Sequence, residues 1–326
     1  MKKSLLALAA LGAFAGAASA QSTVTLFGTI DVAAESQKTT NGLDISATDR
    51  KLANNRQGTS QLSIRVVEDL GGGTKAIALW EGDFDATQNT TNHAAGAQGG
   101  EVFVGLEGGF GRIRLGSPNT PTLSSQAARQ PFSTKLGSGF GGDVLGSAQV
   151  RQNHAIRYDT PNMGGLTASI DAAAMNDNPT RGRVYDLGLN YAAGPLNAWL
   201  TYYKQTLLGT KLLTLQGSYD FGRAVLMLGF HKESSDPGGT NNKGVNIAGK
   251  VLVSGQLNIL ANYARLNDTN VANLDKTIFA IGPQYVLSPR SSIYARVVEE
   301  KNNNVAATAA AVKSVTSFLV GMQHNF

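Results

Sequence analysis

Apolar and polar residues alternate along many short segments of this chain. In Thr23 to Ala33 the apolar positions are Val24, Leu26, Ile30 and Val32, with mostly polar residues between them. Gln61 to Val67 repeats the pattern. A period of two indicates β-strands whose two faces lie in different surroundings.

The links between these segments are long and short in turn. Ser36 to Thr59 and Asp83 to Gly100 are long and polar, whereas Asp69 to Gly73 and Glu107 to Gly109 are tight turns. Counting one strand on each side of every link gives sixteen strands. No apolar run after residue 20 approaches the ~20 residues of a membrane-spanning helix.

Strands that alternate in this way are typical of membrane barrels, in which one face meets lipid and the other meets water. A sheet that crosses a bilayer must close on itself, because every backbone polar group needs a partner within the protein. We therefore predict an all-β protein, a 16-stranded antiparallel transmembrane β-barrel. A soluble all-β protein would have similar overall composition.

The stretch from Ser117 to Val150 interrupts the alternation. It is rich in Ser, Thr, Gly, Pro and Gln, and its charged residues are Arg129, Lys135 and Asp143. A loop of this length in a compact domain is usually functional or disordered. Our hypothesis is that it folds into the lumen and narrows it, and the alternative is a flexible loop exposed to solvent.

The first twenty residues predict export. Lys2 and Lys3 precede an apolar run, and Ala18-Ser19-Ala20 fits a cleavage site, so residues 1–20 are expected to be a signal peptide and 21–326 the barrel domain. Without those two lysines the 28 basic residues fall to 26 against 23 acidic ones, a net charge of +3. Scattered charge of this size does not predict a nucleic-acid partner. Cysteine is absent, so disulfides do not stabilise the fold.

The final segment is also a strand by pattern. Phe318, Val320, Met322, His324 and Phe326 occupy alternate positions, and Phe326 is the last residue. An apolar strand without a polar tail is expected where that strand closes a sheet.

Several motifs in order along the chain carry a family resemblance. They are Thr25-Leu26-Phe27-Gly28, Glu68-Asp69-Leu70-Gly71-Gly72-Gly73, Val104-Gly105-Leu106, Arg157-Tyr158-Asp159 and the terminal Phe326. With them the chain resembles the general porins of Gram-negative β-proteobacteria. The resemblance implies a homotrimeric channel for small hydrophilic solutes, set in outer-membrane lipid and lipopolysaccharide, with its third external loop folded inward. It also implies that Phe326 is an assembly signal read by the barrel-assembly machinery.

Charged residues on the polar faces of the strands are the candidates for a pore constriction. We expect a row of basic side chains on the inner wall, here called the basic ladder. Three residues of the loop lie near it in this prediction, and Glu81 supplies the opposite charge. The wall residues are Arg65, Arg112, Arg114, Arg151, Arg157 and, from the far side, Arg296, and the loop residues are Arg129, Lys135 and Asp143. Guanidinium stays charged at every relevant pH and offers planar donors to anions. The alternative is that these arginines are rim charges or members of structural ion pairs.

The sequence departs from the family pattern at several positions. Gln61, Gly100 and Ser117 stand where relatives usually have arginine, and Gln130 stands where they often have an acid. The two departures act in opposite directions, so we expect a moderate preference for anions. Ile77 and Leu79 are predicted to point inward beside Glu81, where they could pack beneath the loop. The alternative is that the parity assigned to this strand is off by one residue, and periodicity alone does not separate the two.

Motifs for bond chemistry are weak. The four histidines have no metal-ligand spacing, so we predict no metal and no cofactor. Gly137 to Gly142 fits a dinucleotide pattern formally but neither follows a strand nor opens a helix. A diffusion porin is thus the first hypothesis. The others are a selective channel with a binding site for small organic or phosphate anions, an adhesive barrel, and, as the weakest, an enzyme.

Overall fold

The computed structural model describes residues 22–88, 99–128, 130–139, 150–173, 182–207, 209–236, 239, 241–269 and 275–326. The predicted signal peptide lies outside these residues. Within the described ranges, none of the helices has the length and apolar character needed to cross a membrane.

The described chain is almost entirely antiparallel sheet, with one short helix, α2, at Pro121–Ala128. The strands are β1 Thr23–Asn41, β2 Ser46–Asn54, β3 Gln61–Gly71, β4 Thr74–Asp83, β5 Val102–Gly108, β6 Gly111–Ser117, β7 Ala155–Asp159, β8 Leu166–Ala173, β9 Val184–Ala193, β10 Leu196–Gln205, β11 Lys211–Asp220, β12 Ala224–Ser234, β13 Asn241–Leu252, β14 Leu257–Asp268, β15 Lys276–Ser288, β16 Ser291–Asn302 and β17 Val312–Asn325.

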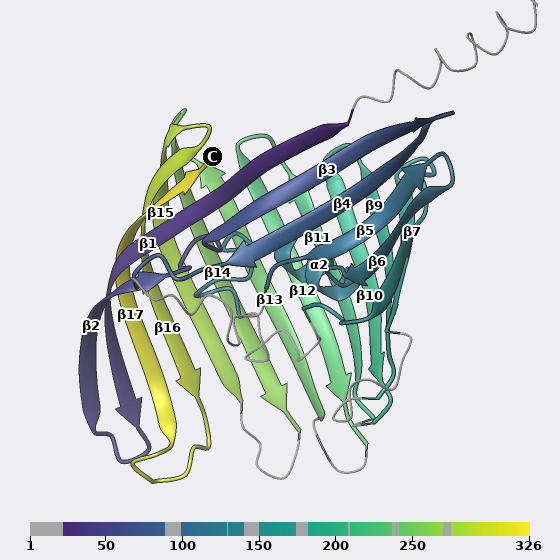
Figure 1. The fold of residues 1–326 in the computed structure, drawn as a ribbon. Coiled ribbons are helices and arrows are strands. Elements are labelled where there is room, and N and C mark those ends of the chain that lie inside the picture. The colour runs from purple at the N-terminus through teal and green to yellow at the C-terminus, as the bar shows by residue number, and fades with distance from the viewer. Residues whose placement is uncertain are drawn as a thin grey trace, which may run out of the picture.

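The sheet closes because its first strand pairs with its last. β1 pairs with β17 from Thr29 opposite Asn325 to Asn41 opposite Val312. On its other edge, β1 pairs with β3 along its first part and with β2 along its second part. β2 and β3 thus share one position in the wall, and the barrel has the 16 strands that the sequence predicted. Figure 1 shows the short turns and the C-terminus at one rim and the longer connections at the other.

The two faces of the wall differ as the alternation predicts. On β1 the side chains of Val24 and Leu26 are exposed on the outer face, whereas those of Asp31 and Glu35 are buried on the inner face. The same parity places Trp80 of β4 outward, with 47% of its surface exposed, and Ile77 inward, with 6% exposed. A lipid-facing surface explains why so many large apolar side chains are exposed on the outside.

The first long link was predicted wrongly. Ser36–Thr59 is not a loop, because β1 continues to Asn41, a tight turn follows, and β2 runs from Ser46 to Asn54. Both faces of β2 carry exposed polar residues such as Asp49 and Arg50, so apolar alternation is absent although the backbone is paired. Apart from the turn at residues 42–45, only residues 55–60 of this link leave the sheet, as a bulge between β2 and β3.

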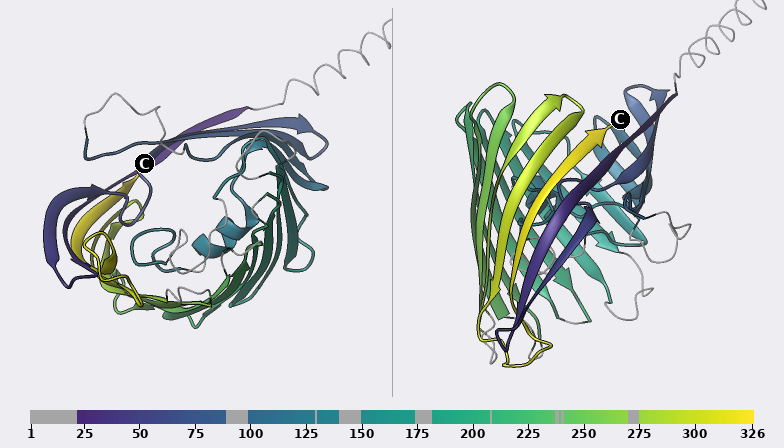
Figure 2. Two further views of the ribbon diagram at one scale, coloured as in Figure 1. Left: turned by 90° about the horizontal axis from the view of Figure 1, so that it is seen from below. Right: turned by 90° about the vertical axis from the view of Figure 1, so that its left-hand side faces the viewer.

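The described parts of the third long connection, residues 117–128 and 130–139, lie against the inner side of the wall. Seen along the barrel in Figure 2, α2 and the chain around it lie inside the ring of strands. Thr122 of α2 bonds to Asp186 on β9, and Leu136 further along the loop bonds to Arg296 on β16. The loop therefore contacts two separate parts of the wall.

Candidate functional site

The first half of the inward loop is fixed by the start of α2. Thr120 is the N-cap residue, since its hydroxyl accepts a hydrogen bond from the N–H of Leu123 at 3.1 Å, and Pro121 occupies the first helical position. Asp186 on β9 accepts hydrogen bonds from the N–H and the hydroxyl of Thr122 at 3.0 and 2.8 Å. A carboxylate at this end of a helix also meets the positive end of the helix dipole.

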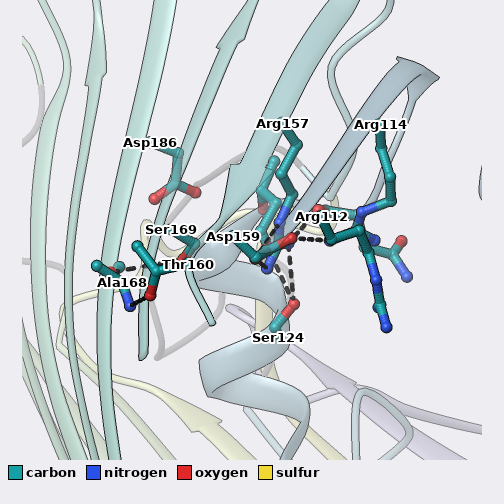
Figure 3. Close-up of polar contacts among 12 residues, drawn as sticks. Arg112, Arg114, Ser124, Arg157, Asp159, Thr160, Ala168, Ser169 and Asp186 are labelled. Atoms are coloured by element: carbon teal, nitrogen blue, oxygen red, sulfur yellow. Dashed lines mark hydrogen bonds and ion pairs between the residues drawn. The ribbon is translucent and has the colours of Figure 1, made fainter. Parts of the chain in front are cut away.

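A buried ion-pair network lies beside α2 (Figure 3). Arg114 on β6 donates to Glu101 and to Asp159, each at 2.7 Å. Arg157 on β7 binds the other oxygen of Asp159 at 2.7 Å and also donates to the hydroxyl of Ser124 in α2 at 3.3 Å. The two guanidinium groups therefore share one carboxylate and hold the helix against the wall.

The second half of the loop packs on the opposite side of the barrel. Phe132 lies in an apolar cluster on the inner faces of β14 to β16. The members from the wall are Leu260, Ala264, Leu266, Ile278, Ala280 and Val298. Asn262 of β14 donates to the carbonyl groups of Gly137 and Ser138 at 2.8 and 3.3 Å. Burying an aromatic ring and satisfying two carbonyl groups gives this segment a defined position.

The bulge at residues 55–60 is held by one buried carboxylate. Asp31 of β1 accepts hydrogen bonds from the N–H groups of Gln57 and Gly58 at 2.6 and 3.1 Å. The hydroxyl of Tyr294 donates to its other oxygen at 2.6 Å. Arg56 forms an ion pair with buried Glu35 at 2.7 Å, so the bulge brings a guanidinium group to the inner side of the wall.

Lys135 joins the loop to this bulge. Its ammonium group donates to the hydroxyl of Thr59 at 2.6 Å. Burial lowers the pKa of Lys135 from its ordinary value, while the neighbouring carboxylates of Asp83 and Asp31 oppose that shift. Asp83 interacts electrostatically with both Lys135 and Arg151. Loop, bulge and β4 thus bring charges of both signs together at one level of the lumen.

The residues predicted for the constriction fall into different environments. Arg151 belongs to the group around Lys135, and Glu81 accepts hydrogen bonds from the N–H of Glu101 and from Gln61 at 2.7 and 3.1 Å. Arg114 and Arg157 are buried in the network beside α2. Arg129 and Asp143 lie outside the described residues.

Two further candidates are away from this group, and a third, Arg296, adjoins it. Arg112 forms an ion pair with Glu107 next to the short turn that follows β5, with a hydrogen bond of 2.6 Å. Arg65 is exposed in the middle of β3. Arg296 is only 2% exposed and contacts both the loop and the bulge.

Sequence reasoning missed four residues that the structure places at the loop and the bulge. They are Asp31, Arg56, Asp83 and Asp186. Asp31 and Asp186 lie on the polar faces of their strands, which the alternation signals, but nothing in a sequence says which loop crosses the lumen to reach them. Arg56 was hidden within the misassigned link.

A cavity of about 510 Å³ opens beside the ion-pair network. Its wall contains three arginines, two acids, several hydroxyl groups and an indole ring, and the residues that matter here are Arg112, Arg114, Arg157, Glu107, Asp159 and Trp199. Such a lining can accept a small polar solute, because it offers charged donors together with a flat apolar surface.

Comparison with known proteins gives consistent matches. A family model described as Gram-negative porin matches residues 7–305. Outer membrane porin protein 32 of Delftia acidovorans is 32% identical over 367 aligned positions, covering 100% of each chain. The major outer membrane protein P.IB of Neisseria meningitidis serogroup B is 34% identical over 202 residues, 60% of this chain and 56% of that one. Among solved structures, the anion-selective porin from Comamonas acidovorans is 27% identical with a TM-score of 0.77, covering 94% of this chain and 100% of that one.

Proposed function

The chain belongs to the Gram-negative porin family, and from that premise we propose that its lumen is a general diffusion pathway with a moderate preference for small anions. It is an outer-membrane channel rather than an enzyme. The proposed cargo consists of ions and small hydrophilic solutes, which pass without forming or breaking bonds.

The observation that carries the proposal is the charge at the level of Lys135. Lys135 lies close enough to Arg151 and Arg56 to interact with them electrostatically, and Asp83 is the acidic group that opposes Lys135 and Arg151. Arg56 is in part neutralised by Glu35. In a narrow passage with low-dielectric walls, fixed charges set the concentrations of the two ions of a salt, so a small excess of cationic groups favours anions.

The similarity to a solved porin supports the sign of this preference. The porin from Comamonas acidovorans is described as anion-selective, and its likeness extends over 94% of the present chain. The net charge of +3 after removal of the signal lysines acts in the same direction, though weakly.

Reversal potential in a planar bilayer under a salt gradient tests the proposal. With the purified protein, the reversal potential should have the sign expected for a channel that prefers anions. Lys135→Glu should shift it toward the value for a cation-selective channel, because the substitution replaces one cation by an anion at the narrowing. Lys313→Glu is the matched control, since Lys313 is exposed and its ion-pair partner is Asp44 at 2.5 Å. A native potential on the cation side would refute the anion preference and leave the barrel intact.

A selective channel with a binding site is the second candidate. The cavity lined by Arg112, Arg157 and Trp199 favours it, because these groups could hold a small organic or phosphate anion. Conductance or flux that saturates with solute concentration, and that becomes linear in Trp199→Ala, would support this function over simple diffusion.

The proposed assembly is a homotrimer in outer-membrane lipid and lipopolysaccharide, inserted by the barrel-assembly machinery through the terminal strand. Phe326 supports the last part, since its N–H and carbonyl both pair with Gly28 of β1 at 3.1 Å and so complete the closing seam. Mass measurement of the detergent complex distinguishes a trimer from a monomer.

A further inference from the structure

The side chain of Arg296 touches three parts of the chain that are distant in sequence. One guanidinium nitrogen donates to the carbonyl of Arg56 in the bulge at 2.9 Å and to the carbonyl of Leu136 in the inward loop at 2.6 Å. The other donates to the side-chain oxygen of Gln57. The central carbon of the guanidinium group also lies over the ring of Phe132, 3.9 Å from its centre.

Its hydrogen-bond partners are neutral. Within the part of the chain that the structure describes, the acceptors of Arg296 are two backbone carbonyls and one amide oxygen, and no carboxylate binds it directly. With 2% of the residue exposed, the charge has lost nearly all its water. Burying a charge without an ion-pair partner costs free energy, which the neutral acceptors and the ring face offset only in part. Stability alone is therefore a poor reason for an arginine here.

Guanidinium is suited to joining separate segments. Its donors are arranged in a rigid plane and point in several directions, while the face of the same plane can stack on an aromatic ring. In this barrel the edge of Arg296 binds the bulge and the loop, and its face covers Phe132. An ammonium group has its three donors around one atom and no planar face, so it could not keep all three hydrogen bonds together with the contact to Phe132.

The two segments that Arg296 contacts, the loop and the bulge, are each held in place by further contacts. The loop side rests on the wall, where Gly137 has φ +88° and an added Cβ would lie 2.5 Å from the Cβ of Ala280. The bulge side is held by Asp31, which Tyr294 on the same strand as Arg296 also binds. A contact between two braced segments can define a fixed distance, whereas a contact between two free loops cannot.

We propose that Arg296 is a positioning residue that locks the inward loop to the bulge at residues 55–60, and that this lock sets the width of the channel and the place of Lys135 within it. This inference rests on the proposed channel function. It differs from a role in the basic ladder, because Arg296 then acts through the two segments it joins rather than by exposing its charge to the passing ion.

Single-channel recording with two substitutions tests the lock. Arg296→Met removes the charge and the donors, and Arg296→Lys keeps the charge but not the planar donors. Both should raise single-channel conductance roughly two-fold and increase open-channel noise, because conductance follows the open cross-section. Both should also admit larger neutral sugars in liposome swelling. Arg265→Met, which removes an exposed ion pair to Asp275 at the end of β14, should leave all three measurements unchanged.

The charge and positioning roles give different results. If Arg296→Lys behaved as the native protein while Arg296→Met changed only the reversal potential, the lock would be refuted. The reversal potential of the native protein tests the anion preference separately. Should either substitution prevent folding, Gln57→Ala and Phe132→Leu remove partners of the intact arginine and should raise conductance and noise in the same direction, and unchanged values would also refute the lock.

Chemical cross-linking provides a rescue. The chain has no cysteine, so Thr59→Cys with Lys135→Cys in the Arg296→Met background creates a single pair across the joint. The reference is the protein that carries Thr59→Cys and Lys135→Cys but keeps Arg296. A short thiol cross-linker should return the open-channel noise and the sugar size limit of the triple variant to the values of this reference. Efficient cross-linking without this return would overturn the proposal.

Discussion

Asp186 on the barrel wall caps the helix of the inward loop through Thr122, at 3.0 Å to its N–H and 2.8 Å to its hydroxyl. Arg296, on a different part of the wall, holds a later segment of the same loop by its contact with Leu136. The loop is thus fixed at two places on opposite sides of the barrel.

Loss of the first of these contacts should destabilise α2. Asp186→Ala removes a fully buried acceptor of two hydrogen bonds from Thr122 and should lower the free energy of unfolding by about 1 to 3 kcal/mol, because the buried N–H of Thr122 loses its acceptor and its hydroxyl keeps only Thr201. Urea titration in liposomes measures the change. Asp220→Ala is a suitable control, since Asp220 caps only an exposed turn at Gly222. Equal losses for both variants would contradict the special position of Asp186.

The charge of Lys135 should disappear at a lower pH than that of an ordinary lysine. Burial lowers the pKa of Lys135, and a lysine is cationic below its pKa, so anion preference should be complete at neutral pH and fall as pH rises into the alkaline range. It should not vanish, because the group around Lys135 also contains Arg56 and Arg151. Reversal potentials between neutral and alkaline pH measure this. Lys135→Arg should give a flat profile, and two parallel profiles would argue against Lys135 as the titrating group.

The shared carboxylate of Asp159 should matter more than an exposed ion pair. Asp159→Asn leaves Arg114 and Arg157 buried with less compensation, which should cost about 3 to 5 kcal/mol. Asp44→Asn breaks the exposed pair with Lys313 and should cost about 0 to 1 kcal/mol. The two variants can be compared by their thermal melting, measured as the change in electrophoretic mobility of the barrel with temperature. Similar melting temperatures would show that the network carries little stability.

Removal of Phe326 should affect assembly more than the finished barrel. Its backbone pairs with Gly28 and its ring lies against the same glycine, where an added Cβ would be 2.5 Å from the ring. Deletion should reduce the amount inserted in the outer membrane, while Phe326→Tyr keeps the ring and should insert normally. Fractionation followed by protease protection measures insertion. Normal insertion of the deleted chain would refute the assembly role.

Much of the wall could be predicted because strand parity is a local property. Trp80 points outward and Ile77 inward, so that strand was assigned in the correct register despite two apolar residues on its inner face. The strand count was also correct. The error at Ser36–Thr59 has a physical cause: beyond the apolar band both faces of a hairpin meet water, so Asp49 and Lys51 alternate with other polar residues and leave no signal.

The site was less predictable because it depends on contacts across the lumen. Parity indicates that Arg296 faces inward, but not that a loop about 160 positions away covers it. Arg157 and Asp159 lie two positions apart on one face of β7, so strand parity could have indicated that ion pair. The contact between Arg296 and Leu136, by contrast, follows from the fold of the loop and not from any periodicity.

The seam between β1 and β17 has a consequence for biogenesis, because Thr29 lies opposite Asn325 and the ring cannot be completed before β17 has been synthesised. Until then the molecule has two unsatisfied edges, and its closure joins residues of very high contact order, which is slow and leaves it prone to aggregation. Cellular yield of variants should therefore depend on how long the open precursor survives before insertion, and a substitution can deplete the membrane of this protein without weakening the mature ring.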